Sequence, residues 1–252
     1  MNIADRDAPL AKNAPDLKVI LPLDWAIIIG LKVSHFDPDQ TLQKNRDNCN
    51  AESYAMRVGL VSDIHCNARG LSEALTIMGD IDELICLGDS IYEYRFSNEV
   101  VALLRRRGAQ VIVGNHEECF FGPHGARARA RDGIDKELAA WLAGQPHRRE
   151  LEIGDKRLLL IHSTPWEPRG AYVHPGSTLL SGFGEADADF VLYGHTHQQL
   201  VERIGRVLVI NPGSAGDARD PRNGGMLSCA VLDTVSEEVR VLDFPDPQRR
   251  AR

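Results

Sequence analysis

Two histidines, His195 and His197, stand two residues apart in the stretch VLYGHTHQQL, directly after a glycine and a short apolar run. Other polar residues follow apolar runs in the same way along the chain: Asp63, His65, Asp89, Asn115, His116 and His162. Oxygen and imidazole donors of this kind suit Mn, Fe, Zn, Co or Ni. With His116 left aside, seven donors are too many for one ion, and they divide between two ions if one carboxylate bridges them.

A structural explanation exists for each of these residues taken alone. An aspartate or asparagine after a strand can hold a turn, and a buried histidine can simply hydrogen-bond a neighbour. The whole set is harder to explain in this way, because burying several polar groups without partners is costly. The joint occurrence therefore favours a metal centre.

The elements that would position these residues alternate between strand and helix. Short apolar runs predict strands over residues 57–63, 83–89 and 110–116. Between them, apolar residues at helical spacing predict helices over 67–79 and 97–108. This alternation indicates βαβ units with right-handed crossovers and a parallel sheet.

The three predicted strands end in Asp63, Asp89 and Asn115, and the second and third of these each come 26 positions after the one before. Equal βαβ units place equivalent side chains next to one another along one edge of the sheet. In open α/β sheets, ligands bind at the carboxyl ends of the strands. We therefore expect the metal-binding residues at this edge.

The second half of the chain is richer in strands. Apolar runs predict them over residues 156–162, 188–195, 206–211, 226–233 and 237–244. A helical region that includes residues 135–144 precedes them. We expect a mixed second sheet packed on the first, with helices outside, which makes the fold class α/β.

Composition divides the chain into three parts. Residues 1–55 contain a polar stretch with no sustained period, and we expect a poorly ordered N-terminal extension or an artefact of the start site. Residues 56–245 carry the predicted strands and helices and form the expected folded domain. Residues 246–252 are expected to be a frayed tail.

Charge and cysteine content limit the partners and the location. The 252-residue chain carries a formal charge of −7, which argues against a broad nucleic-acid-binding surface, because phosphate contacts need clustered Lys and Arg. The five cysteines show no CxxC spacing, and the N-terminus lacks the basic region of a signal peptide. The apolar stretch over residues 17–33 is interrupted by Pro22 and Asp24. We expect a cytoplasmic protein with no membrane segment.

Six motifs resemble, in the same order, those of the calcineurin-like metallophosphoesterases: SDIHCN, LGDS, GNHE, IHSTP, GHTH and NPGS. The resemblance is nearest to the small bacterial and archaeal phosphodiesterase branch related to YfcE, and it covers roughly residues 56–245. It implies a four-layer α/β/β/α sandwich of two mixed sheets flanked by helices, with a dinuclear metal site at the C-terminal ends of the strands.

The resemblance also implies a role for each residue of the set. The implied ligands of one divalent ion are Asp63, His65 and His197, those of the other are Asn115, His162 and His195, and Asp89 is implied to bridge the two. Mn is the expected metal, with Fe, Zn, Co or Ni as alternatives. His116 is implied to lie near the substrate phosphate, where an imidazole suits a catalytic acid that protonates the leaving oxygen.

The expected activity is hydrolysis of a phosphodiester by a metal-bridging hydroxide. Two cations about 3.5–4 Å apart can clamp a phosphate and lower the pKa of a shared water. A phosphomonoesterase or a dinucleoside-polyphosphate hydrolase is the alternative among enzymes, and a non-catalytic binding scaffold, such as a retromer subunit, is the alternative outside them. The complete ligand set favours an enzyme. The expected partner is a small phosphoester or nucleotide substrate, and homo-oligomer formation is left open.

Two segments of the sequence differ from patterns found in the superfamily. Family members usually have glycine where Cys66 stands, and a left-handed backbone there would cost a non-glycine residue about 1–2 kcal/mol. We interpret Cys66 as a tolerated small residue, with an oxidation-sensitive thiol as the alternative. The protein phosphatases of the superfamily carry Asp-Arg-Gly soon after the bridging aspartate. Tyr92, Glu93 and Tyr94 stand here instead, which disfavours a protein phosphatase.

Weaker candidates for substrate contact lie in two other segments. Ser214 and Arg219 follow the NPG turn, although such loops are often only turns. Arg127, Arg129 and Arg131 are expected to form a solvated helix face, with contact to a substrate phosphate as the alternative.

Overall fold

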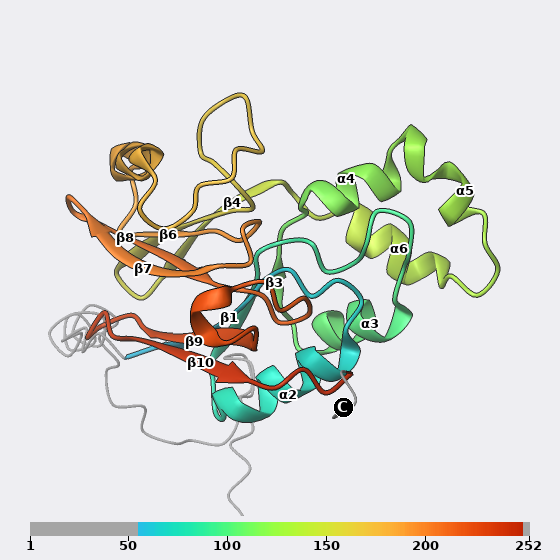
Figure 1. Ribbon diagram of the computed structural model, residues 1–252, viewed down its shortest axis with the longest axis horizontal. Coiled ribbons are helices and arrows are strands. Elements are labelled where there is room, and N and C mark those ends of the chain that lie inside the picture. Colours follow the sequence, from blue (N-terminus) through green and yellow to red (C-terminus); the bar gives the residue numbers. More distant parts are fainter. Residues whose placement is uncertain (1–54, 249–252) are drawn as a thin grey trace, which may run out of the picture. The chain divides into compact units, whose positions relative to one another are not determined.

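The computed structural model describes residues 55–248, and in this part the chain folds into two mixed sheets with helices around them (Figure 1). The predicted α/β class with two mixed sheets is confirmed. The predicted N-terminal extension over residues 1–55 lies outside the described residues except for residue 55, and the predicted tail over 246–252 lies outside them from residue 249 on. None of the described helices has the length and apolar character needed to cross a membrane.

The strands divide into two sheets of five within the described residues. The first sheet contains β1 (Arg57–Val61), β2 (Glu83–Cys86), β3 (Gln110–Val111), β9 (Leu227–Asp233) and β10 (Val239–Phe244), in the order β10-β9-β1-β2-β3. The second contains β4 (Arg148–Ile153), β5 (Lys156–Ile161), β6 (Phe190–Leu192), β7 (Gln199–Ile204) and β8 (Val207–Pro212), in the order β4-β5-β6-β8-β7.

Short helices connect these strands. The α-helices of the described chain are α2 (Ala68–Met78), α3 (Asn98–Arg106), α4 (Asn115–Phe121), α5 (Ala126–Arg129) and α6 (Lys136–Ala143). The 3₁₀ helices are η2 (Pro123–Gly125), η3 (Thr178–Glu185) and η4 (Pro221–Asn223).

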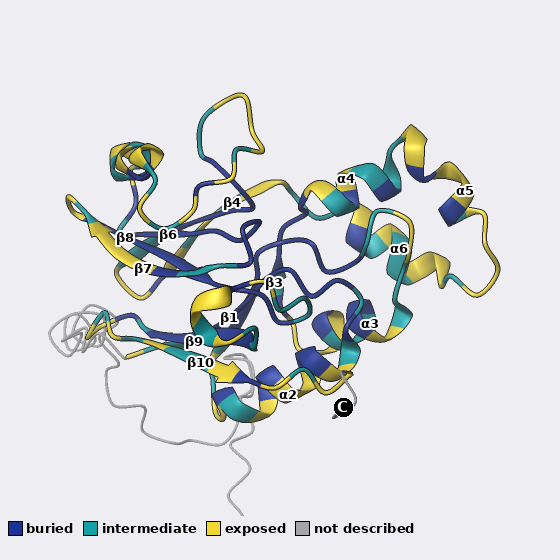
Figure 2. Ribbon diagram, in the orientation of Figure 1, coloured by how far each residue is buried: buried dark blue, intermediate teal, exposed yellow. Residues whose placement is uncertain are grey.

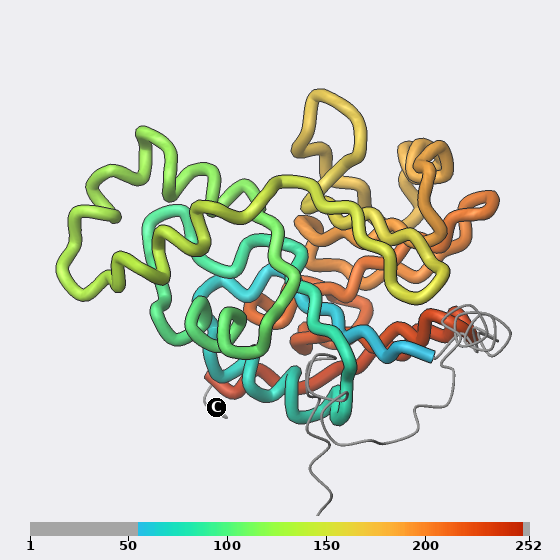
Figure 3. The backbone as a smooth tube through the Cα atoms, turned by 180° about the vertical axis from the view of Figure 1, so that it is seen from behind, coloured from blue at the N-terminus to red at the C-terminus, as the bar shows by residue number. Residues whose placement is uncertain are grey.

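The first sheet combines a parallel half with an antiparallel half. Strands β1, β2 and β3 pair in parallel and are joined through α2 and α3, as the alternation of strands and helices predicts. Strand β9 pairs antiparallel with β1, and β10 with β9. The prediction that these last two strands join the second sheet is therefore wrong, because the apolar pattern of a strand does not identify its partner. Figure 3 shows the beginning of the described chain beside its C-terminal strands.

The second sheet has a parallel centre and antiparallel edges. Strands β5, β6 and β8 pair in parallel, while β4 pairs antiparallel with β5 and β7 with β8. The sequence did not predict β4 and β7. Both are edge strands in which most residues are exposed or half-buried, so they lack the apolar run that marks the central strands.

Three apolar layers hold the fold together (Figure 2). The space between the sheets is filled from both sides, for example by Leu60 of the first sheet and Phe190 of the second. Helices α2 and α3 cover the outer face of the first sheet with residues such as Leu71. The outer face of the second sheet is covered by Leu180 and Phe183 of η3, so the fourth layer of the sandwich is a 3₁₀ segment rather than an α-helix. Burying each such side chain contributes about 1.5–3 kcal/mol.

The third predicted strand is much shorter than expected. Strand β3 ends at Val111, and the chain turns at Gly114 into helix α4, which starts at Asn115. Asn115 and His116 therefore occupy the first turn of a helix and not the end of a strand. The side chain of Glu117 accepts a hydrogen bond from the Gly114 N–H at 2.9 Å, which stabilises this helix start.

Candidate metal centre

The predicted metal-binding residues come together from both sheets. They lie on loops that leave the C-terminal ends of parallel strands or at the start of α4: Asp63 and His65 after β1, Asp89 after β2, Asn115 and His116 after β3, His162 after β5, and His195 and His197 after β6. This is the edge at which α/β sheets bind ligands.

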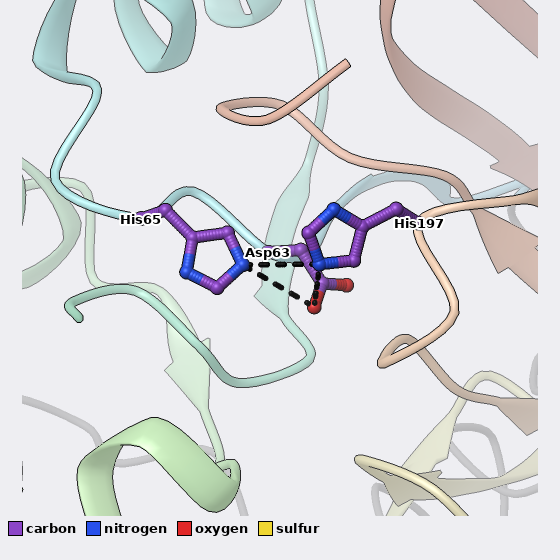
Figure 4. Close-up of side chains that lie close together, drawn as sticks. All are labelled: Asp63, His65 and His197. Atoms are coloured by element: carbon purple, nitrogen blue, oxygen red, sulfur yellow. Dashed lines mark hydrogen bonds and ion pairs between the residues drawn. The ribbon is translucent and has the colours of Figure 1, made fainter. Parts of the chain in front are cut away.

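One group of donors consists of Asp63, His65 and His197, all buried (Figure 4). The Nε2 atoms of the two histidines lie 3.1 Å apart. Oδ1 of Asp63 lies 3.3 Å from Nε2 of His197 and 3.9 Å from Nε2 of His65. One carboxylate oxygen and two imidazole nitrogens thus converge on one point.

A second group consists of Asp89, His162 and His195, also buried. Nε2 of His162 lies 3.2 Å from Oδ2 of Asp89 and 3.1 Å from Oδ1 of Asn115. The amide of Asn115, which starts α4, is therefore in place to complete this group.

The carboxylate of Asp89 connects this second group to a third arrangement, because it also lies close to His65 and His116. Nε2 of His116 is 3.7 Å from Oδ2 of Asp89, and its Nδ1 is 2.5 Å from Oε2 of Glu93. The side chain of His116 is 21% exposed, whereas those of Asp89 and His65 are buried. His116 thus faces the open side of the site, and its Nδ1 also accepts a hydrogen bond from the Glu93 N–H at 3.2 Å.

The hydrogen bonds of Asp63 fit a metal ligand. Its Oδ2 accepts hydrogen bonds from Oγ of Ser62 at 2.6 Å and from the backbone N–H of His195 at 3.0 Å. Its Oδ1 is buried and has no hydrogen-bond partner within the described residues. A buried carboxylate oxygen without a partner is costly, and a cation coordinated by this oxygen removes that cost.

Three of the histidines are oriented from behind by backbone carbonyls. The ring nitrogens and their carbonyl partners are Nδ1 of His162 with Leu87 at 2.7 Å, Nε2 of His195 with Gly170 at 3.2 Å, and Nδ1 of His197 with Asp217 at 3.0 Å. A ring N–H that donates to a carbonyl fixes the tautomer and leaves the other nitrogen as a lone-pair donor. In this arrangement His162 and His197 offer Nε2, and His195 offers Nδ1.

The histidines and the aspartate of the site differ in their protonation states. Burial lowers the pKa of His65 and that of His195 to about 4, so both rings are neutral at pH 7. Burial also opposes ionisation of Asp63, but the close approach of His197 and the charge of the neighbouring imidazoles outweigh it and hold the pKa of this carboxyl well below its usual range. Burial would likewise lower the pKa of His162, but the neighbouring Asp89 carboxylate raises it to about 10. If His162 is a metal ligand, as predicted, it must lose a proton to bind the ion.

The backbone of the site is strained. Within residues 55–248, the non-glycine residues with a left-handed backbone are Asp63 (φ 51°), His65 (48°), Cys66 (63°), Asp89 (52°), His195 (66°), His197 (57°) and Glu237 (59°). Five of these seven are predicted metal ligands. Such a conformation costs an L-residue about 1–2 kcal/mol, and it persists where the surrounding structure enforces it, as at functional sites. The strain therefore supports the prediction of a site at these loops.

Glu117 supports the site in a way that the sequence did not indicate. Its buried carboxylate accepts five hydrogen bonds, from the N–H groups of Asp89 (2.9 Å), Ser90 (2.7 Å), Ile91 (3.1 Å) and Gly114 (2.9 Å) and from Oγ of Ser90 (2.7 Å). It thereby joins the Asp89 loop to the start of α4. Burial raises the pKa of this carboxyl. The only signal in the sequence was an acidic residue directly after His116 in the GNHE motif.

Asn211 is a second supporting residue that the sequence did not indicate. It is fully buried, and its Nδ2 donates to the carbonyl of Gly194 at 2.8 Å and to Oγ1 of Thr196 at 3.1 Å. Its Oδ1 accepts from the N–H of Gly213 at 2.9 Å. Asn211 of the NPGS motif therefore holds the GHTH loop in place.

The two weaker candidates after NPG have structural contacts. The hydroxyl of Ser214 is buried, donates to the carbonyl of Asp63 at 2.7 Å and accepts from the N–H of Asp217 at 2.8 Å, so it supports the Asp63 loop. The guanidinium of Arg219 is 60% exposed and pairs with the Asp217 carboxylate at 2.6 Å. Substrate contact by Ser214 and Arg219 stays a prediction.

The arginine side chains of the α5 region do not all point into solvent. Arg129 is half-buried and donates to the carbonyls of Phe120 and Gly122 at the end of α4. Arg131 donates to the carbonyl of Tyr94 at 3.3 Å. At least these two side chains therefore have structural partners, and the prediction of a solvated face is wrong for Arg129.

Cys66 has the left-handed backbone that makes glycine the better residue at its position. Its Sγ donates to the carbonyl of Arg95 at 3.1 Å. Burial raises the pKa of the Cys66 thiol, which keeps the reactive thiolate scarce at neutral pH. These observations favour a tolerated residue over an oxidation-sensitive one.

A cavity of about 700 Å³ opens beside the second group of donors. Asn115 and His162 line it together with the basic residues His147, Arg148 and Arg169. Oε1 of Glu118 pairs with Nδ1 of His147 at 2.9 Å and with Nη1 of Arg169 at 3.2 Å. The cavity is large enough for a substituent of a substrate whose reacting group lies at the donors.

The chain is similar in sequence or in fold to several known proteins. The phosphodiesterase MJ0936 of Methanocaldococcus jannaschii is 25% identical over 73% of this chain and 97% of its own length. The uncharacterized protein MJ0912 of the same organism is 29% identical over 73% of this chain and 86% of its own length. The crystal structure of a metallophosphoesterase from Sphaerobacter thermophilus superposes with a TM-score of 0.62 at 24% identity, covering 77% of this chain and 89% of that one.

The family assignment rests on a match over most of the described chain. Residues 56–237 match the calcineurin-like phosphoesterase superfamily domain. This range includes every donor of the groups described above. The chain therefore belongs to the calcineurin-like phosphoesterase superfamily and is a metal-dependent phosphoester hydrolase.

Proposed function

We propose that the protein hydrolyses small phosphodiesters with two divalent metal ions. The observation that carries the proposal is the position of Asp89, whose carboxylate belongs to donor groups on both of its sides. Asp63, His65 and His197 would hold one ion, and Asn115, His162 and His195 would hold the other. Oxygen and imidazole donors in these numbers suit Mn, with Fe, Zn, Co or Ni as alternatives.

The proposed cations would supply positive charge that binds the phosphate. They would also lower the pKa of a water, which could then lose a proton and attack phosphorus near neutral pH. The chain itself orients the donors. Ser62 and the His195 N–H hold the carboxylate of Asp63, and backbone carbonyls hold three of the imidazoles. Ligands fixed in this way need little rearrangement, which is the condition for electrostatic stabilisation of a transition state.

His116 is the proposed general acid. Its Nδ1 accepts a hydrogen bond from the Glu93 N–H at 3.2 Å and lies beside the Glu93 carboxylate, and its Nε2 faces the site from the exposed side. A ring placed in this way can donate the Nε2 proton to the oxygen of the leaving alcohol. It can also be read as a ligand, because it lies within reach of His65 and Asp89. Its exposure and its bond to Glu93 favour the acid.

A diester is favoured over a monoester by two observations. The cavity beside Asn115 and His162 provides room for an ester substituent next to the donors. A relative that matches over most of its length is named a phosphodiesterase. Monoesters and dinucleoside polyphosphates are the competing substrates.

The test is a metal-by-substrate activity screen on the purified full chain. Each of Mn, Fe, Zn, Co and Ni is supplied in turn, and hydrolysis of bis(4-nitrophenyl) phosphate, 4-nitrophenyl phosphate and diadenosine tetraphosphate is compared. Bound metal is measured for the wild type, for Asp89→Asn and for the matched control Asp187→Asn, whose carboxylate pairs with Arg157 and Arg206 on the surface.

We expect two ions per chain and a preference for the diester in the wild type and in Asp187→Asn. Asp89→Asn should bind fewer than two ions and lose most activity. Two retained ions with near-normal turnover in Asp89→Asn would contradict the bridging role. A preference for the monoester or the dinucleotide would replace the proposed substrate class.

A further inference from the structure

Three aromatic rings form a row that starts at the metal centre. The ring of Tyr172 stacks on that of His195, with centroids 3.9 Å apart and an angle of 25° between the planes. The ring of His174 lies nearly parallel to that of Tyr172, at 6.0 Å and 16°. Tyr172 is 59% exposed, and His174 is also exposed. The row therefore leads from a predicted ligand to the surface.

The other histidine-stacking tyrosine of the site differs from Tyr172. Tyr92 stacks on His65 with centroids 4.6 Å apart, and the guanidinium carbon of Arg95 lies 4.8 Å over its ring. Tyr92 is only partly exposed and has partners from its own chain. Tyr172 carries a large exposed aromatic surface instead, directly beside a donor group.

The chemistry of such a surface is specific. A planar heterocycle can stack on a tyrosine ring without regard to its hydrogen-bonding pattern, because every base has a π-face. A nucleotide carries its base and its phosphate on the same ribose. A platform that begins at His195 is therefore close enough to the proposed phosphate site for both ends of one nucleotide to be bound.

We propose that Tyr172, together with His174, is a stacking platform for the base of a nucleotide, which makes the substrate a nucleoside phosphoester. This inference rests on the proposed function, since the phosphate must bind at the donors for the base to reach the platform. Tyr172 is the specificity-determining residue, and His174 extends the platform. Nδ1 of His174 lies 3.2 Å from Oε1 of Gln198, which restrains that ring.

A purely structural role for Tyr172 predicts a different behaviour. If the ring only shields His195 from water, its removal weakens the metal centre and affects all phosphate ligands alike. If the ring binds a base, its removal affects only ligands that carry one. Two ligands that differ in the base alone separate these cases.

The experiment measures binding of adenosine 5′-monophosphate and of ribose 5-phosphate to the metal-loaded full chain by calorimetry. Wild type, Tyr172→Ala, Tyr172→Phe and His174→Ala are compared, with bound metal determined in each. Tyr94→Ala is the matched control, because Tyr94 is 51% exposed and has no ring contact with the donor histidines among the described residues.

We expect the wild type to bind the nucleotide about 5- to 100-fold more tightly than the sugar phosphate. Tyr172→Ala should remove this difference, because its affinity for the nucleotide falls while its affinity for the sugar phosphate is unchanged. Tyr172→Phe and Tyr94→Ala should keep the difference, and His174→Ala should reduce it. Equal affinities in the wild type, or an equal loss for both ligands in Tyr172→Ala, would overturn the platform while leaving phosphate binding intact. Absence of binding by both ligands would also overturn the platform, and the diester activity screen would then decide separately whether the proposed function stands.

Discussion

Replacement of Glu117 by glutamine should destabilise the fold and loosen the metal centre. The carboxylate accepts two hydrogen bonds at Oε2, from Asp89 and Gly114, and three at Oε1, from Ser90 and Ile91. A glutamine has only one acceptor oxygen. In its better orientation it keeps the three bonds at Oε1 and turns an NH₂ group toward the N–H groups of Asp89 and Gly114.

The expected magnitude follows from these two lost bonds. A buried N–H left without an acceptor costs about 1–3 kcal/mol, so the two together cost about 2–6 kcal/mol. The substitution also removes a buried negative charge close to Asp89, which opposes the loss. We therefore expect the free energy of unfolding at pH 7 to fall by about 2–4 kcal/mol. The ions should also bind less tightly, because the Asp89 loop loses an anchor.

Urea denaturation and metal analysis of Glu117→Gln test this reasoning. The matched control is Glu118→Gln, the next residue of the same helix, whose 42% exposed carboxylate pairs with His147 and Arg169 at the surface. The control should change the free energy of unfolding by no more than about 0.5–1 kcal/mol. A Glu117→Gln protein as stable as the control, with normal metal content, would refute the assigned role.

Other perturbations address single residues. His116→Gln should keep both proposed ions but lose about 10²–10⁴ in turnover on an alkyl ester and much less on a nitrophenyl ester, because a good leaving group needs little protonation; an equal loss on both esters would indicate phosphate positioning. Cys66→Gly should be about 1 kcal/mol more stable than Cys66→Ala in urea denaturation, since the backbone is left-handed there, and the opposite order would contradict the strain. A chain beginning at Met56 should fold and keep most activity, because β1 starts at Arg57; an insoluble product would place earlier residues in the core. Metal affinity should rise with pH up to about 10, because His162, whose pKa is raised to about 10, must lose its proton before it can bind an ion. Calorimetry in buffers of different ionisation enthalpy should show this proton release on binding.

Local patterns in the sequence predicted the elements that position the donors. The apolar runs of β1 and β2 and the helical spacing of α2 and α3 are properties of short segments, and the structure confirms them. The interval of 26 positions between Asp63 and Asp89 reflects their equivalent places after β1 and β2. What could not be predicted depends on contacts between distant segments.

Three features show this limit. The pairing of β9 with β1 joins residues far apart in the chain, and no property of either strand alone identifies the other. The left-handed backbone of Asp63 is enforced by its surroundings, whereas sequence patterns mark such positions mainly through glycine. The helical start at Asn115 depends on Glu117, and four of the five hydrogen bonds of its carboxylate exist only after the Asp89 loop is in place.

The donors of the first group come from different sheets, and this has a consequence for how the molecule unfolds. His65 follows a strand of the first sheet and His197 a strand of the second, 132 residues later. An ion shared by them would act as a cross-link that neither sheet can keep alone. Its binding free energy would then stabilise the protein only while both sheets are folded, so the metal-loaded protein should unfold as one cooperative unit. The ion-free chain would be the form in which one sheet can open while the other persists.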